Sequence, residues 1–146
     1  MYALLLAWAC ADHHDDEAGT HPHDSGSTPT ATAPPEALTD GGTWRVRYAT
    51  DPDPIPLNDY FDLTLSVFDG ETGTLPATDL VSLSFDAGMP DHGHGMNVQP
   101  TLTDLGGGET LVEGLLFHME GAWAMTVQVT GTGGMETATF DVDCCE

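Results

Sequence analysis

Apolar and polar residues alternate along several short segments of this chain, and this period of two narrows the possible folds more than any other feature. In 60–68, apolar residues at every second position alternate with mostly polar ones. This pattern indicates a β-strand with one buried face. The same pattern predicts further strands at 43–49, 81–86, 97–105, 110–119, 122–130 and 138–144.

Turn-forming residues separate the predicted strands, and no segment beyond the first ten residues has the period of a helix. Turns rich in glycine or proline are expected at 51–56, 69–73, 106–108 and 131–134. Six or seven short strands over roughly 100 residues predict an all-β domain, an antiparallel immunoglobulin-like β-sandwich. We expect Trp44 and Trp123 in its core, with Val81 and Val98 facing inward from their strands.

An apolar run at residues 3–9 ends at Cys10 and is too short to cross a bilayer as a helix. It fits the apolar part of a signal peptide, and small residues directly before a cysteine resemble a bacterial lipobox. We therefore predict a signal peptide at 1–9, lipid on the Cys10 thiol, and an exported protein in the cell envelope. Ala7 and Trp8 depart from the usual lipobox, and a plain N-terminal strand or helix is the alternative.

Residues 10–40 are mostly small, polar or acidic, and Leu38 is their only large apolar residue. Such a segment cannot bury enough apolar surface to offset the entropy of ordering it. We therefore expect a disordered tether, followed by a folded domain at 41–146. Loose metal binding by the tether and a merely solvated acidic linker are two open alternatives. The tether contains four histidines, His13, His14, His21 and His23.

The chain carries 24 Asp and Glu residues against two basic residues, Arg45 and Arg47, and its formal net charge is −22. Binding to nucleic acid or to anionic lipid headgroups requires basic patches, so we exclude both. Contact with a membrane would then occur through the lipid anchor alone. The charge favours solubility and attracts cations, and a solvated acidic surface without a specific partner is the alternative.

Histidine and methionine gather in the segment 89–96, Met-Pro-Asp-His-Gly-His-Gly-Met, which follows a predicted strand. A second pair of these residue types ends another predicted strand just before a turn. Strand ends cluster at one pole of a sandwich, so these side chains can meet there. Imidazole suits copper, zinc and nickel, and thioether sulfur selects Cu(I), so we predict a copper site. Its candidate ligands are Met89, His92, His94, Met96, His118 and Met119.

The same residues also have a purely structural interpretation. Met89 and the following proline would then form a turn, Met119 would fill the core, and the histidines would be exposed without a role. Two geometries are open for the histidine segment. In an extended strand His92 and His94 project from the same side and can chelate one ion, whereas a flexible glycine loop lets the two imidazoles converge.

Three motifs occur in order along the chain: Met-Pro-x-His-Gly-His-Gly-Met after a strand, then Gly-Leu-Leu-Phe-His-Met, then Gly-x-Trp opening the next strand. Over about 43–144, this arrangement resembles the YtkA-like domain family and its FixH-like relatives, small exported β-sandwich domains. The resemblance implies an immunoglobulin-like fold, an extracytoplasmic location, and an association with copper handling or respiratory-oxidase maturation.

Cys144 and Cys145 are adjacent near the end of the last predicted strand. A disulfide between neighbouring cysteines carries strain, so a reduced pair and a strained bridge both stay open. We expect Cys144 to be buried and Cys145 to be frayed, and a thiolate site for Cu(I) is the alternative.

No motif for an activated nucleophile, a phosphate loop or a Schiff-base lysine is present, so we expect no enzyme. The sequence predicts a lipid-anchored metal-binding module that sequesters copper or hands it on. Its expected partners are a metal ion and a cell-envelope protein. The alternative function is a non-catalytic immunoglobulin-like interaction or adhesion domain.

Overall fold

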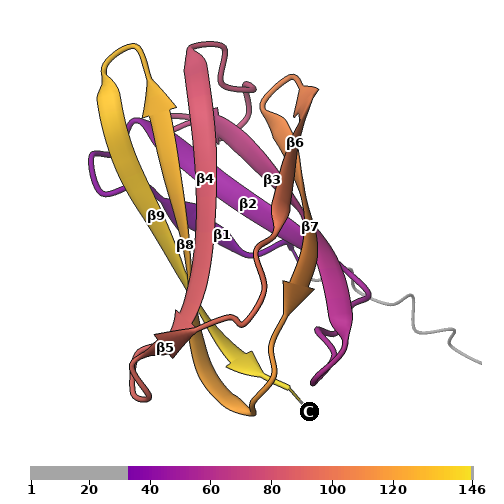
Figure 1. Ribbon diagram of the computed structural model, residues 1–146. Helices are drawn as coiled ribbons and strands as arrows, with labels where there is room; N and C mark the ends of the chain where they lie inside the picture. Colours follow the sequence, from indigo (N-terminus) through magenta and orange to yellow (C-terminus); the bar gives the residue numbers. More distant parts are fainter. Residues whose placement is uncertain (1–32, 146) are drawn as a thin grey trace, which may run out of the picture. The chain divides into compact units, whose positions relative to one another are not determined.

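The computed structural model describes residues 33–145, which form nine β-strands (Figure 1). None of these residues belongs to a helix that is long and apolar enough to cross a membrane. The predicted all-β fold is confirmed, and the two shortest strands are additions to the seven longer ones. The strands are β1 (Glu36–Leu38), β2 (Trp44–Asp51), β3 (Tyr60–Asp69), β4 (Leu80–Met89), β5 (His94–Gly95), β6 (Thr101–Gly106), β7 (Glu109–Leu116), β8 (Gly121–Gly131) and β9 (Gly134–Cys144).

The strands form two antiparallel sheets, with the orders β1-β2-β3-β7-β6 and β5-β4-β8-β9. In the view of Figure 1, β4, β8 and β9 cross in front of β2 and β3. Without the short strands β1 and β5, these orders are the ABED and CFG sheets of a constant-type immunoglobulin domain. The predicted immunoglobulin-like β-sandwich is therefore confirmed.

Side chains from the inner faces of both sheets fill one hydrophobic core. The predicted inward positions of β3 and β8 are all buried, and Trp44 and Trp123 are only 2% and 1% exposed. Burial of a large apolar side chain contributes about 1.5–3 kcal/mol relative to exposure, so this core holds the two sheets together. Its largest fully buried side chains are Trp123, Phe61, Phe117, Leu63, Leu65, Met89, Leu115 and Met125.

The folded domain begins earlier than predicted, because β1 lies within the expected tether. Glu36 of β1 binds both arginines of β2, with Oε1 2.8 Å from Arg45 Nη1 and Oε2 2.7 Å from Arg47 Nε. Thr39 follows β1, is buried, and donates a hydrogen bond from its hydroxyl to Glu136 at 2.6 Å. The predicted end of the tether is therefore wrong, since polar contacts rather than apolar burial attach this segment.

Val81 does not face the core, although its place in the alternation predicts that it does, and its side chain is 67% exposed. The register between β4 and β8 shifts between Leu80 and Ser82, which marks a β-bulge. The extra residue turns Val81 outward and lets Leu80 pack against the core instead. Beyond the bulge, Leu83 and Phe85 pack against the core as predicted.

The strand predicted at 97–105 starts later, at Thr101 in β6, and Val98 lies outside it. Pro100 explains the late start, because proline has no N–H for the ladder of a sheet. Leu102, rather than Val98, packs against the core. The prediction of Val98 as the inward residue of this strand is therefore wrong.

β7 ends at Leu116, before the predicted end of that strand, and this leaves His118 and Met119 in the connection to β8. The register of β7 against β3 also shifts near Gly114, whose φ is 80°. Glycine adopts such a positive φ without steric cost, and the bulge keeps Leu115 fully buried. The last buried residues of β7 therefore lie at the end of the sandwich.

Candidate metal centre

The predicted ligands lie at one end of the sandwich, where β4 turns into β5, β7 connects to β8, and β9 ends (Figure 1). The connection between β2 and β3 is tied to the same end, because the backbone N–H of Asn58 donates a hydrogen bond to the carbonyl of Phe117 at 2.8 Å. We call this end the histidine pole, after His92, His94 and His118.

The β4–β5 hairpin positions two of the three histidines. The carbonyl of Met89 accepts hydrogen bonds from the backbone N–H groups of His92 and Gly93, at 3.1 and 2.9 Å, which closes a tight turn. His94 is the cross-strand partner of Met89, so the two side chains share the inner face of the sheet edge. Of the two geometries open for this segment, the structure has a turn followed by a short strand, and both imidazoles are exposed.

His118 reaches the pole from the β7–β8 connection, and contacts on both sides hold its backbone. Phe117 is buried, and its ring stacks on Trp123 with centroids 4.2 Å apart and planes 6° from parallel. The indole Nε1 of Trp123 donates a hydrogen bond to the carbonyl of Met119 at 3.0 Å. These two contacts fix the residues that precede and follow His118.

The three imidazole rings form a short row. The ring centroids of His92 and His94 are 5.8 Å apart, and those of His94 and His118 are 5.3 Å apart. Trp123 flanks the row, with its ring centroid 6.4 Å from His94 and 5.6 Å from His118. Within 33–145, no three His, Cys, Asp or Glu side chains are already arranged around one point as metal ligands. Binding of one ion by these histidines therefore requires the rings to rotate. Two nitrogen atoms that share an ion each lie about 2 Å from it.

The Nδ1 atom of His118 is buried and has no hydrogen-bond partner. In the described part of the chain it is the only buried side-chain nitrogen or oxygen atom without a hydrogen-bond partner. An unpaired buried polar atom costs about 1–3 kcal/mol, so such atoms are rare in native structures and call for an explanation. A metal ion at this nitrogen would remove the penalty, and His118 is therefore the strongest candidate ligand of the row.

Met96 and Met119 are the two methionines that lie close to the histidines in sequence and are not fully buried. Met96 lies two residues beyond His94, so it faces the same side, and it packs partly buried against the core. Met119 is 38% exposed, so it does not fill the core. Met89 is 2% exposed and lies against Gly121, and for this reason we leave it out of the proposed ligand set.

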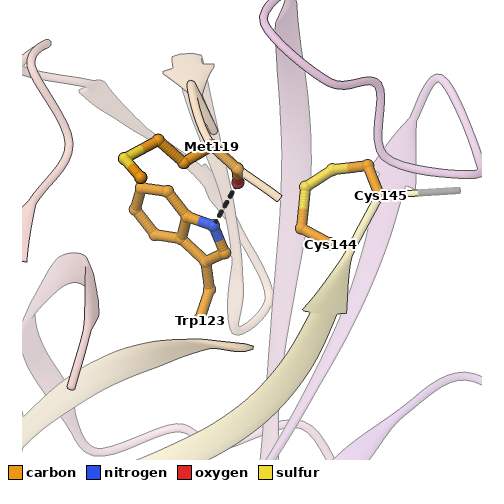
Figure 2. The surroundings of a disulfide bond; sticks show 4 residues. All are labelled: Met119, Trp123, Cys144 and Cys145. Atoms are coloured by element: carbon orange, nitrogen blue, oxygen red, sulfur yellow. Dashed lines mark hydrogen bonds between the residues drawn. A yellow bond between two sulfur atoms is a disulfide. The ribbon is translucent and has the colours of Figure 1, made fainter. Parts of the chain in front are cut away.

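Figure 2 shows Cys144 and Cys145 at the end of β9, in the neighbourhood of Met119 and Trp123. The two sulfur atoms are joined in a disulfide. Cys144 is buried on the inner face as predicted, whereas Cys145 is partly buried against the core rather than frayed. A bridged pair offers no thiolate, so imidazole nitrogen and thioether sulfur remain the donors of the pole that suit copper.

Carboxylates border the pole, and among residues 33–145 both arginines are already paired. Asp91 and Glu120 are exposed and directly adjoin the two histidine motifs. Hydrogen bonds from Arg47 and then Arg45 hold the pKa of Glu36 below its ordinary value. The positive charge of both arginines is therefore paired with Glu36. The pole therefore presents negative charge to an approaching cation.

Sequence reasoning missed the part that Trp123 has in the site. Its alternation places it in the core, which is correct, but alternation does not show that its ring lies nearly perpendicular to those of His94 and His118. The sequence does contain a signal for this contact, because the Gly-x-Trp motif closely follows His118-Met119. A tight turn at that glycine brings the tryptophan back beside the residues that precede the turn. Cys10 and the four tether histidines lie outside the described residues, so their roles stay predictions.

Comparison of the chain with protein-family models, with curated proteins and with solved structures gives no match. The resemblance to YtkA-like domains therefore rests on the three short motifs.

Proposed function

We propose that this chain is an exported copper-binding module, anchored by lipid on Cys10 in the cell envelope, which sequesters copper or hands it on. The observation that supports this proposal is the row of His92, His94 and His118, whose inner end holds a buried Nδ1 atom without a partner. A metal ion and a cell-envelope protein are its partners. The module holds and passes the metal and catalyses no reaction.

Two or three imidazoles with one thioether suit copper in either oxidation state. In this proposal His118 and His94 hold the ion on the inner side, and Met96 or Met119 supplies the sulfur. Neutral imidazole is the ligand form, so protons compete with copper and binding weakens as the solution becomes acidic. The surrounding carboxylates raise the local concentration of cations and speed capture, but they do not select copper.

The test is titration of the full chain with Cu(I) and with Cu(II), in competition with a chromophoric chelator. The variant His92→Ala/His94→Ala removes the His-x-His pair of the pole. The matched control His21→Ala/His23→Ala removes a pair with the same spacing from the tether. Tight binding of one equivalent should be lost only in the first variant, with the circular dichroism spectrum unchanged. Unchanged affinity in that variant would refute the proposed site.

A second candidate function, an immunoglobulin-like interaction domain, is favoured by the edge of β4. β5 pairs only with the last two residues of β4, and no other described strand lies along the rest of that edge. A groove of about 200 Å³ opens there. Its lining includes Leu80, Leu102 and the exposed Val81. An extended segment of a partner can pair with such an edge.

Val81→Lys separates the two functions, because a lysine on a sheet edge opposes pairing with another strand. If the domain acts through this edge, the substitution abolishes co-purification of its envelope partner and leaves copper binding intact. Retained co-purification would remove the support that this edge gives to the second function.

A further inference from the structure

We propose that copper leaves the histidine row by ligand exchange at His92, that His118 releases it last, and that the acceptor is a basic protein with imidazole or thioether donors. This inference rests on the proposed function, because it takes copper as the ion bound by the row. It adds a direction of transfer and a chemical class of partner.

The three histidines differ in exposure along the row. His92 is exposed on the β4–β5 turn, where backbone hydrogen bonds to Met89 hold its position. His94 is exposed on β5, with its Nδ1 atom 3.2 Å from the carbonyl oxygen of Gly95. His118 is partly buried, and its Nδ1 atom is inaccessible to water. An ion on the row therefore meets solvent and partners first at the His92 end.

Protein closes the opposite end of the row. Trp123 is 1% exposed and lies edge-on to His94 and His118, with interplanar angles of 77° and 79°. Phe117 stacks on Trp123, and its carbonyl is tied to Asn58 of the β2–β3 connection. An acceptor cannot reach His118 first without moving this layer of the core, but it can replace His92 by approaching the turn.

Charge selects the acceptor. Asp91 precedes His92 on the turn, and Glu120 follows the second histidine motif, and both carboxylates are exposed. The arginines of β2 are paired with Glu36, so no cation of the described residues offsets the two carboxylates. An acceptor with lysine or arginine around its copper site is therefore attracted to the turn, whereas an acidic one is repelled.

The exchange is a substitution at copper and transfers no electron. A donor atom of the acceptor binds copper as the bond between copper and the His92 nitrogen breaks. The same substitution follows at the thioether sulfur and at His94, and last at His118. Each histidine leaves as neutral imidazole, so no proton is taken up or released when the donors of the acceptor are neutral as well.

Two synthetic peptides with the same histidine and methionine donors serve as acceptors, one rich in lysine and the other rich in glutamate. The full chain is loaded with one equivalent of Cu(I), and transfer is followed by stopped-flow spectroscopy. The rate should rise with acceptor concentration and be at least about tenfold higher for the lysine peptide at low salt. Added salt should reduce that difference, because it screens exposed charges.

Two substitutions distinguish the ends of the row. His118→Ala should lose at least about tenfold more copper affinity than His92→Ala. His92→Ala should pass copper to the lysine peptide at least about tenfold faster, because one coordination position is already open. His21→Ala in the tether is the control and should change neither value. Circular dichroism verifies that each variant is folded.

Three results would overturn the inference: a transfer rate independent of acceptor concentration, an equal or reversed order of the two affinity losses, or equal rates with both peptides at low salt. If the wild-type chain binds no copper, the proposed function itself fails. That outcome differs from copper binding with the wrong order of losses, which leaves the function standing and removes only this inference.

Discussion

The indole of Trp123 lies flat on the ring of Phe117 and edge-on to the imidazole of His118. One buried ring therefore connects the hydrophobic core to the histidine pole. Aromatic pairs contribute about 0.5–1.5 kcal/mol beyond the area that they bury. The packing that stabilises this end of the sandwich is also the packing that positions the half-buried histidine, so stability and metal affinity should change together when this ring is altered.

Replacing Trp123 by alanine should lower the free energy of unfolding by about 3–5 kcal/mol, because a large buried side chain is lost and a cavity remains. Trp123→Phe should lose less, since it keeps an aromatic ring against Phe117, although it gives up the hydrogen bond to Met119 and part of the buried ring volume. Urea denaturation measures both values. A loss under about 1 kcal/mol for the alanine variant would contradict a core position, because it is closer to the effect of a surface substitution.

Deletion of residues 1–32 and deletion of residues 1–40 should differ in their effect on stability. The longer deletion removes β1 and Thr39, whose hydroxyl oxygen accepts a hydrogen bond from the backbone N–H of Trp44 at 3.1 Å. Leaving that buried N–H unpaired costs about 1–3 kcal/mol. Thermal melting should show a lower midpoint for the longer deletion only. Equal midpoints would mean that β1 adds nothing to the domain.

Acid should destabilise the domain in part through Asp69. Its carboxylate accepts hydrogen bonds from the backbone N–H groups of Thr72 at 2.7 Å and Leu75 at 3.0 Å. These bonds, chiefly the one from Thr72, lower the pKa of Asp69 to about 2. A carboxyl group with a lower pKa in the folded chain stabilises the fold above its unfolded pKa, and this contribution is lost as the pH falls through the folded value.

The melting temperature should therefore fall between about pH 4 and pH 2. Asp69→Asn should melt at a lower temperature at neutral pH and show a shallower fall over that range. Glu36 and Glu136, whose pKa values are also lowered, should account for the dependence that remains. An identical slope in the variant would show that Asp69 takes no part.

Cys10→Ser should release the protein from membranes or stall its processing, because a serine hydroxyl cannot take the place of the cysteine thiol in lipid attachment. Fractionation of cells, with the partition of the protein followed by immunoblotting, measures this effect. Cys145→Ser is a control that leaves the N-terminal motif intact and should keep the wild-type distribution. Unchanged membrane retention of Cys10→Ser would count against the lipid anchor.

The long strands could be predicted from the sequence because each sheet buries only one of its faces. Every second residue of β3 and of β8 is buried, and the alternation shows this directly. Alternation fails where a strand gains an extra residue, as it does at Val81. It also fails for β1, which is attached through Glu36 and two arginines and has no apolar pattern to detect.

The meeting of His92, His94 and His118 could also be predicted, because strand ends gather at one pole of a sandwich. The buried Nδ1 atom of His118 could not, since it depends on how Trp123 and the β2–β3 connection pack around one short segment. Local patterns describe which face a residue occupies, whereas the environment of a single nitrogen atom is a property of the whole tertiary structure.

The two tryptophans of residues 33–145 lie at opposite ends of the sandwich, and this gives the protein an optical reporter together with an internal reference. Trp123 adjoins the imidazoles, whereas Trp44 packs against Gly131, which is eight residues further along β8 and so roughly 26 Å away. Copper held by the row should quench the fluorescence of Trp123 and leave that of Trp44 unchanged. The emission spectrum of the unlabelled protein would then report at which end the metal is bound.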